Sequence, residues 1–453
     1  MATKEFPLIP KNVEHVETKN RRIKTPIPVP ESIPILEQLR AAEPRSMGGQ
    51  PPVLWDKGEG CLIRDRFGNQ WIDFSSGVLV TAIGHGHPRI IKAIQETADG
   101  LYHAYCFPTE IRTKLTTTIQ KLLPKPLSRV FLVTTGAEST ECAIKLAKTH
   151  GRKVGGPAKR VFVTFDNCFH GRTMGSQLAG GSDGLKTWIG DGDYGFVQVP
   201  YPDGFRCPDT SFKVFTETLA AKGIDPDSVC GVMSETYQGC NAALMPAEYA
   251  QSLRKWCDDH GAVLIFDEVQ AGFGRTGKLF GFEHYGVVPD LACFGKGVSG
   301  GMPLSVVVGT DELMSMYGPG EMTSTHSANP VCAAAALANI EEIVEKDLTG
   351  NAKKLEPILL KAGQDMMASS KGRIGRCDGA GLVIALQFVE PGTTNPDPEL
   401  AFEVVTKAIE RGVMLFAPVG VGGGAIKINP PLIIDESTLR EGLDVIAGIV
   451  AEI

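Results

Sequence analysis

A lysine in a glycine-rich turn is the residue of this chain best suited to covalent chemistry. Lys296 follows the short apolar run 291–294 and has Gly295 and Gly297 as its neighbours. The run is too short for anything but a buried strand, and the glycines leave the amine nitrogen open to approach. Withdrawal from water lowers the pKa of an ammonium group. The free amine of Lys296 could then attack a carbonyl carbon.

A carboxylate after another apolar run could act beside that amine. Asp267 directly follows the run 262–266, and a buried carboxylate is costly unless it is paired. It could keep a pyridine nitrogen protonated, because opposite charges stabilise each other, and a pyridinium ring withdraws electrons from a carbanion. A helix cap or a core salt bridge is the alternative role. Lys296 at the next strand end favours a cofactor.

The turn after the apolar run 130–133 suits a phosphate group. Residues 134–140 are small or polar and lead into 141–148, a strong helix-forming stretch. The first turn of a helix exposes unpaired N–H groups and a positive dipole end, both of which favour a phosphate dianion. Any helix start favours such residues, so this turn is supporting evidence only.

The stretch 165–173 adds an aromatic ring and a cation. Phe169 could stack on a flat heterocycle, and the planar guanidinium of Arg172 suits a carboxylate. Plain packing is the alternative role for Phe169. An amine, a carboxylate for a pyridine nitrogen, a phosphate turn and an aromatic ring together indicate pyridoxal phosphate, whose aldehyde is the carbonyl that Lys296 would attack.

The elements that must position these residues are short apolar runs alternating with longer amphipathic stretches. Near-continuous apolar strands between helices predict an α/β fold with a doubly wound, mostly parallel sheet that is covered on both faces. Ligands of such sheets bind at the carboxyl ends of the strands. The predicted strands are 130–133, 161–163, 229–233, 262–266, 291–294 and 304–308.

After about residue 345 the pattern changes to two helical stretches, 352–368 and 398–411, with short strands at 382–386 and 426–428. These elements predict a separate, smaller layer. The proline-rich N-terminal segment predicts an arm that wraps a surface, for which a partner subunit is one candidate. The expected units are 1–75 as arm and part of the small domain, 76–345 as the large cofactor-binding domain and 346–453 as the C-terminal small domain.

Composition excludes several classes of function. The chain has 453 residues, of which 43% are hydrophobic, and a net charge of −7, so no basic surface for nucleic acid is expected. No apolar run approaches the roughly 20 residues that span a bilayer, and no signal core is found, so we expect a soluble, cytoplasmic protein. The eleven cysteines lack metal-ligand spacing. Neither disulfides nor a metal site is predicted.

In this order, the stretches resemble the class III aminotransferases, the subgroup II family of fold type I pyridoxal phosphate enzymes that includes 4-aminobutyrate, ornithine and taurine aminotransferases. The resemblance extends from about Gly60 to Ile434. The motifs that carry it are 65–74 with 84–88, 267–277 with 289–291 and Lys296, 324–330, and 430–432.

The resemblance implies a fold type I transferase with a large doubly wound sheet domain and a smaller α+β domain formed by the N- and C-terminal segments. It implies that Lys296 forms the Schiff base with the cofactor and then moves a proton between substrate and cofactor carbons. Asp267 would pair with the pyridine nitrogen.

The resemblance also implies the other cofactor contacts and a shared active site. Thr325 would reach the phosphate from a neighbouring subunit, which implies an obligate homodimer and leaves open whether dimers pair into tetramers. The remaining contacts would be Gly136 and Ala137 on the phosphate, Val269 and Phe169 on the two ring faces, and Gln238 beside the phenolic oxygen.

Four residues are implied in substrate binding. Lys427 stands where relatives usually offer an arginine to the α-carboxylate, which the glutamate matching Glu235 sometimes masks. A lysine lacks the bidentate fork, and a solvated strand-edge cation is its alternative role. Arg172 stands where 4-aminobutyrate and ornithine aminotransferases bind a distal carboxylate, and Val78 completes the predicted set.

The resulting hypothesis is ping-pong transfer of an amino group from an ω-amino acid or another primary amine to an oxo acid, 2-oxoglutarate or pyruvate. Racemases, aminomutases and phospholyases share the fold and the lysine, so they are the alternative. A non-catalytic ligand-binding relative is a third hypothesis. A transaminase needs an oxo acid to recover after reacting with the donor, whereas an isomerase or a lyase does not.

Overall fold

The computed structural model describes residues 4–190 and 192–453 and divides the chain into two compact units. The larger unit is Pro88–Thr349, and the smaller one combines Met1–His87 with Gly350–Ile453. The chain therefore changes unit after His87 and Thr349, where the sequence predicted changes after residues 75 and 345. Each end of the chain contributes to the smaller unit.

The larger unit contains a seven-stranded sheet in the order β6-β12-β11-β10-β9-β7-β8. Neighbouring strands are parallel except that β12 runs antiparallel to both β11 and β6. This confirms the predicted mostly parallel sheet and adds β8, which the sequence pattern missed. The strands are β6 (Arg129–Val133), β7 (Val161–Phe165), β8 (Phe196–Val199), β9 (Val229–Glu235), β10 (Val263–Asp267), β11 (Leu291–Phe294) and β12 (Ser305–Gly309).

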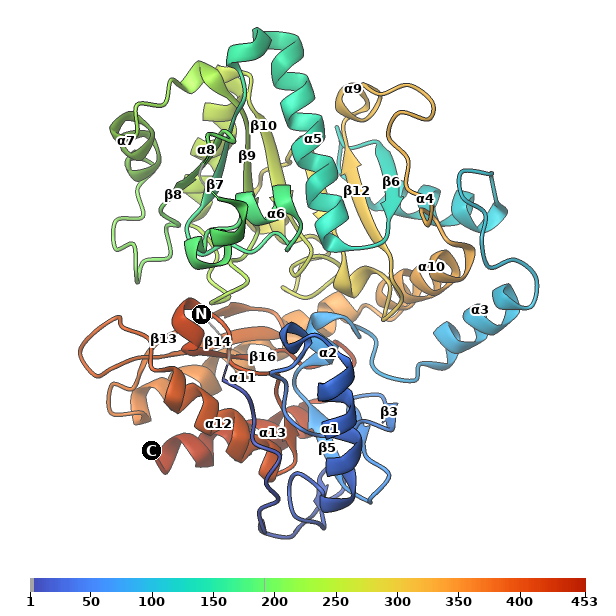
Figure 1. Cartoon of the computed structure of the whole chain (residues 1–453), viewed down its shortest axis with the longest axis vertical. Helices are drawn as coiled ribbons and strands as arrows, with labels where there is room; N and C mark the ends of the chain where they lie inside the picture. The colour runs from blue at the N-terminus through green and yellow to red at the C-terminus, as the bar shows by residue number, and fades with distance from the viewer. Residues whose placement is uncertain (1–3, 191) are drawn as a thin grey trace. The chain divides into compact units, whose positions relative to one another are not determined.

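Helices cover both faces of this sheet. Phe162 of β7 belongs to the core beneath α5, which contains Leu146 and Ala147, and Figure 1 shows α5 lying across the strands. Phe165 points to the other face, where its ring lies 6.4 Å from that of Tyr249 on α8. A strand buried on both faces must be apolar throughout, which explains the near-continuous hydrophobic runs.

The helices of the larger unit are α3 (Pro88–Ala98), α4 (Glu110–Leu122), α5 (Gly136–Gly155), α6 (Met174–Ala179), α7 (Lys213–Ala221), α8 (Ala247–His260), α9 (Asp311–Met314) and α10 (Pro330–Glu345). Its 3-10 helices are η3 (Gly156–Ala158), η4 (Asp183–Leu185), η5 (Thr187–Ile189), η6 (Pro226–Ser228), η7 (Gly281–Tyr285) and η8 (Lys296–Val298).

The smaller unit joins the two ends of the chain in one sheet, because β15 from the C-terminal segment pairs with β5 from the N-terminal segment. That sheet has the order β1-β2-β5-β4-β3, and a second, antiparallel sheet has the order β13-β14-β16. Strands and helices together confirm the predicted α+β domain built from both termini.

The strands of the smaller unit are β1 (Val16–Glu17), β2 (Arg22–Ile23), β3 (Lys57–Glu59), β4 (Leu62–Arg64), β5 (Gln70–Asp73), β13 (Ile374–Ala380), β14 (Val383–Phe388), β15 (Val413–Met414) and β16 (Ala425–Ile428). Its helices are α1 (Ile33–Ala42), α2 (Ser76–Leu79), α12 (Pro398–Glu410), α13 (Glu436–Ala451), η1 (Pro30–Ser32), η2 (Arg45–Met47) and η9 (Val421–Gly423), and α11 (Leu348–Ser369) lies in it except for its first residues.

The N-terminal arm packs on the smaller unit of its own chain. The ring of Phe6 stacks on Phe402 of α12 with 4.2 Å between centroids, and Arg21 forms a 2.8 Å ion pair with Glu441 of α13. The arm therefore uses helices of the same chain as a packing surface.

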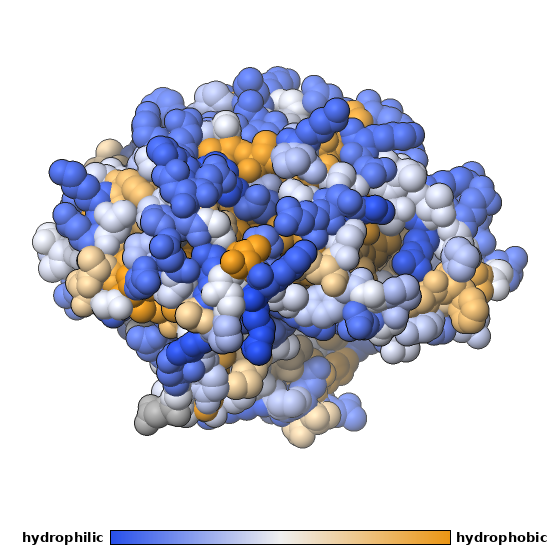
Figure 2. Space-filling model, turned by 90° about the horizontal axis from the view of Figure 1, so that it is seen from above, coloured by the Kyte–Doolittle hydropathy of each residue, from blue (hydrophilic) through white to orange (hydrophobic). Residues whose placement is uncertain are grey.

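Within residues 4–190 and 192–453, no helix combines the length and the apolar character needed to cross a membrane. On the face drawn in Figure 2, hydrophilic residues predominate and hydrophobic ones form separate small groups. The same residues contain no cluster of three or more side chains suited to hold a metal ion.

Candidate active site

Lys296 lies in a strained turn directly after β11. Its φ of +45° is in the left-handed region, which residues other than glycine seldom adopt. Burial lowers the pKa of its ammonium group below the ordinary value, although the negative charges of Asp267 and Glu235 act in the opposite direction. The amine of Lys296 is therefore more readily neutral than the amine of a lysine in water.

Asp267 is the last residue of β10, and sheet register sets its neighbours. It lies opposite Cys293 of β11 and Glu235 of β9. The carboxyl ends of three parallel strands thus bring Glu235, Asp267 and the turn of Lys296 to one edge of the sheet. This edge is where the sequence predicted ligand binding.

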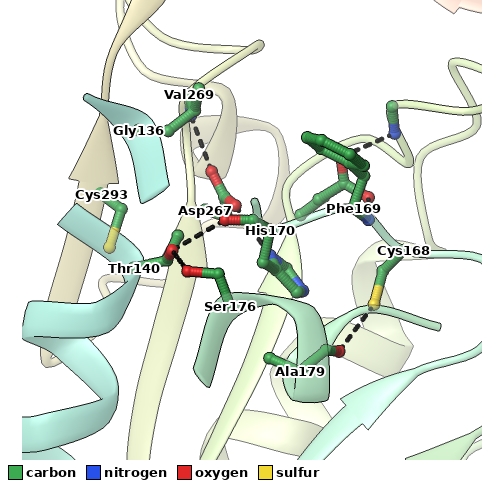
Figure 3. A network of polar contacts seen from close by, with 12 residues as sticks. Gly136, Thr140, Cys168, Phe169, His170, Ser176, Ala179, Asp267, Val269 and Cys293 are labelled. Carbon is green, nitrogen blue, oxygen red and sulfur yellow. Dashed lines mark hydrogen bonds and ion pairs between the residues drawn. The ribbon is translucent and has the colours of Figure 1, made fainter. Parts of the chain in front are cut away.

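A buried histidine holds the Asp267 carboxylate. Figure 3 shows Oδ2 of Asp267 facing Nδ1 of His170 at 2.7 Å, while Oδ1 accepts a 3.0 Å hydrogen bond from the backbone N–H of Val269. Burial by itself lowers the pKa of His170, but interactions with Cys168 and Asp267 raise it well above its ordinary value. The contact with His170 and the N–H of Val269 together hold the Asp267 carboxylate in a fixed orientation.

His170 lies in the stretch 165–173, whose sequence pattern predicted no role for it. Its position between Phe169 and Gly171, just after a buried strand, was the available signal. The role became visible only through its contact with Asp267, a residue 97 positions away in the chain.

The N-terminus of α5 keeps two backbone donors available. Thr135 and Glu138 form a capping box, in which Glu138 also accepts a 2.7 Å hydrogen bond from the N–H of Thr134. The backbone N–H groups at the first two helical positions, Gly136 and Ala137, have no hydrogen-bond partner within the helix. Their N–H groups are therefore suited to a phosphate.

Glycine at position 136 allows a close approach that a side chain would block. A Cβ built on Gly136 would lie 3.1 Å from Cγ1 of Val269, and one on Gly295 would lie 3.3 Å from the same atom. The absence of a side chain at Gly136 and at Gly295 therefore lets the start of α5 and the lysine turn pack closely against Val269, just after β10.

The segment with Phe169, His170 and Arg172 is tied to α5. The hydroxyl of Thr140 donates to the carbonyl of His170 at 2.8 Å, as Figure 3 shows. Gly171 has φ of +137°, and a Cβ there would lie only 2.8 Å from Cβ of Ala137. The phosphate turn and the aromatic segment are thus held against each other.

Arg172 offers a cation at the surface of this segment. Its guanidinium carbon lies 5.4 Å from the ring centroid of Phe169, which is 39% exposed. Arg172 is itself exposed, and among the described residues it has no carboxylate partner within ion-pair distance. Its fork of donors is therefore available to an anion.

Glu235 is a buried carboxyl group held by backbone donors. It accepts 3.0 Å hydrogen bonds from the N–H groups of Phe169 and Gly239, and burial raises its pKa to about 7. The cation His170 lowers this pKa and Asp267 raises it. The carboxyl group of Glu235 therefore changes its charge near neutral pH.

Comparison with known proteins decides the family. The chain matches the model of the family described as aminotransferase class-III over residues 45–450. The chain belongs to the class III aminotransferases. It is 35% identical over 452 residues to a 4-aminobutyrate aminotransferase of Mycobacterium leprae. This alignment covers 96% of this chain and 99% of that protein.

Two further comparisons extend the similarity. The chain is 33% identical to the 5-aminovalerate aminotransferase DavT of Pseudomonas putida, over 92% of this chain and 98% of that protein. An amine transaminase from an uncultivated Pseudomonas species, solved in its pyridoxal phosphate-bound form, is 27% identical with a TM-score of 0.79 and covers 88% of this chain and 93% of its own.

The class III aminotransferase transfers amino groups with pyridoxal phosphate as its cofactor. Its residues fit that group, because Lys296 offers an amine of lowered pKa, Asp267 offers a fixed carboxylate and Gly136 and Ala137 offer two N–H donors. Relatives named for amino-group transfer do not favour the racemase, aminomutase or phospholyase alternative.

Gln238 and Thr325, two residues predicted to contact the cofactor, lie in surroundings that do not by themselves indicate such a contact. The Gln238 amide donates to the carbonyl of Asp166 at 2.6 Å and accepts from Asn241 at 2.7 Å, so both ends are bonded within the protein. Thr325 is exposed in the segment before α10. Their contacts with the cofactor stay predictions.

Val78 and Lys427 belong to the smaller unit of the enzyme. Val78 is 41% exposed and has φ of +64° in the left-handed turn α2. Lys427 is 2% exposed on β16, which contradicts its alternative role as a solvated strand-edge cation because neighbouring side chains cover it. Their substrate contacts stay predictions.

Ionisation of Glu235 should make the stability of the cofactor-free enzyme depend on pH. The folded protein raises this pKa from 4.5 to about 7, so it holds a proton that the unfolded chain releases. The stability contribution of the protonated group is therefore present at low pH and is lost as pH rises from about 5 to about 7.

Glu235→Gln removes this titration. The melting temperature of the wild type minus that of the variant should decrease between about pH 5 and about pH 7, measured by scanning fluorimetry. Glu268, whose pKa burial also raises to about 7, is present in both proteins and cancels in the difference. A difference that is constant with pH would contradict the prediction.

Proposed function

We propose that this enzyme moves the amino group of an ω-amino acid, or of another primary amine, to 2-oxoglutarate or pyruvate in a ping-pong cycle. The observation that carries the proposal is the buried amine of Lys296 beside the Asp267–His170 pair. Relatives named for 4-aminobutyrate and 5-aminovalerate support the ω-amino acid class. The cytoplasmic location stays a prediction of the sequence.

Lys296 would act twice in each half of the cycle. Its amine would hold the cofactor through the aldehyde carbon, with loss of water, and once released by the substrate amine it would serve as the base and then the acid for the proton of the substrate carbon. Bound pyridoxal phosphate supplies the electron sink that makes this proton removable. Lys296 is therefore both the point of attachment and the acid–base group.

The other residues would hold the ring in place. Asp267 would accept a hydrogen bond from the pyridine nitrogen, and His170 keeps its carboxylate oriented for that contact. Gly136 and Ala137 donate to the phosphate, while Val269 and Phe169 cover the two ring faces.

Lys296→Ala should remove the visible absorbance of the covalently bound cofactor and reduce turnover with amine donors by about a thousandfold or more. The control Lys255→Ala, which removes an exposed lysine paired with Asp259 on α8, should keep both. Absorbance spectra and steady-state rates check this. Persistence of both signals in Lys296→Ala would overturn the assignment of the lysine.

Arg172 is proposed to bind the distal carboxylate of the substrate. Its guanidinium is exposed next to Phe169, and a planar fork can donate two parallel hydrogen bonds to a carboxylate. Lys427, which is buried on β16 of the smaller unit, is the second candidate cation.

Arg172→Leu should reduce kcat/KM for 4-aminobutyrate by about 10- to 100-fold, the loss expected for a charged hydrogen bond. A simple amine without a carboxylate should react at nearly the wild-type rate. Arg66→Leu is the matched control, because Arg66 makes a similar contact at 5.2 Å with the ring of Phe67. The donor half-reaction is followed by cofactor absorbance, and equal losses for both donors would refute this role.

We also propose a homodimer with shared active sites. Exposed Tyr102 and Phe107 lie on the loop before α4, and this loop contacts the segment that carries Thr325. Nδ2 of Asn329 donates to the carbonyl of Tyr102 at 2.6 Å, and Tyr105 pairs with Thr323 at 3.2 Å. This exposed aromatic surface beside Thr325 suits a second copy of the chain.

Mixed dimers test the shared site. As homodimers, both variants should be inactive. Lys296→Ala lacks the amine, and the carboxylate introduced by Thr325→Glu repels the phosphate. Co-expressed, they should regain about a quarter to a half of the activity, because a mixed dimer contains one site with both native residues. Lack of recovery in isolated mixed dimers, or a monomer by light scattering, would exclude the shared site.

A further inference from the structure

A buried amide interrupts the alanine-rich inner face of α10. Asn339 is fully buried and has Ala335, Ala336 and Ile340 as buried neighbours along the helix. A polar group in such surroundings is costly unless it makes hydrogen bonds. Its partners therefore indicate why the position is polar.

Both hydrogens of the Asn339 amide are used on the turn that Lys296 begins. Nδ2 donates to the carbonyl of Gly297 at 2.9 Å and to the carbonyl of Val298 at 3.0 Å. The opposite orientation of the amide would place its oxygen against two carbonyl oxygens, so the contacts determine which end is nitrogen. α10 thus anchors η8 through one side chain.

The anchored turn is strained. Lys296 has φ of +45°, in the left-handed region that residues other than glycine seldom adopt. The other end of the amide is unsatisfied, since Oδ1 of Asn339 is buried and lacks a hydrogen-bond partner among the described residues. Strained backbone and unsatisfied buried groups persist where the surroundings enforce them, and they concentrate at functional sites.

We propose that Asn339 is a positioning residue for Lys296. The position of the Lys296 backbone determines where its side chain begins. It therefore limits which atoms the amine reaches. By holding two successive carbonyls of the turn, Asn339 keeps the amine within reach of both the cofactor aldehyde and the substrate carbon. The inference rests on the proposed role of Lys296 and extends it to the helix behind the turn.

The test compares Asn339→Ala with Asn351→Ala. Asn351 is a matched control, because its Nδ2 also donates to two backbone carbonyls, those of Leu432 at 2.6 Å and Ile434 at 3.1 Å. Pyridoxal phosphate is added to cofactor-free enzyme, and the growth of the visible band gives the rate at which Lys296 attaches it. Asn339→Ala should slow this rate about tenfold or more, and Asn351→Ala should not.

Catalysis gives a second signal. With 4-aminobutyrate as donor, kcat of Asn339→Ala should fall about tenfold or more while KM stays within about twofold, since a misplaced amine slows proton transfer and leaves binding unchanged. Deuterium on the amine-bearing carbon of the donor should slow the variant more than the wild type. A merely structural role would change the melting temperature without this isotope effect.

Each outcome decides the proposal. Wild-type attachment rate and kcat in Asn339→Ala, or equal losses in Asn351→Ala, would overturn it. Asn339→Ser, whose hydroxyl can donate to one of the two carbonyls, should give intermediate rates and replaces the alanine variant if that variant does not fold. If the wild type does not use 4-aminobutyrate, the proposed substrate class fails, and the attachment rates still decide the role of Asn339.

Discussion

The contact between His170 and Asp267 is the interaction on which the active site depends. A buried carboxylate without a partner would take up a proton, and it could then no longer stabilise a pyridinium ring. The 2.7 Å contact with His170 gives this buried carboxylate a partner and orients it. Thr140, which holds the carbonyl of His170, extends this support into α5.

Sheet register turns that pair into a site. Because β9, β10 and β11 run parallel, Glu235 and Asp267 end at the same edge as the turn of Lys296. Glycines at 136, 171 and 295 then allow the start of α5, the aromatic segment and the lysine turn to pack more closely than side chains would permit. The same edge therefore presents an amine, a carboxylate and two N–H donors.

Sequence patterns predicted the main strands and the residues expected to do chemistry, but not their supports. Lys296 and Asp267 stand out because a charged residue at the end of a buried apolar run is unusual in any fold. His170 and Asn339 carried no such signal, since a histidine or an asparagine is ordinary until its partner is known. Those partners come from segments that only folding brings together.

The sequence by itself predicted the mostly parallel sheet and the residues of the cofactor chemistry, and its motifs resembled those of the family, because apolar periodicity and motifs are local properties of the chain. Only the tertiary structure decided the pKa shifts and the geometry of the site. The pKa of Lys296 is lowered, that of His170 is raised and that of Glu235 reaches about 7. Such shifts depend on burial and on charges from distant segments, which have no position until the chain folds.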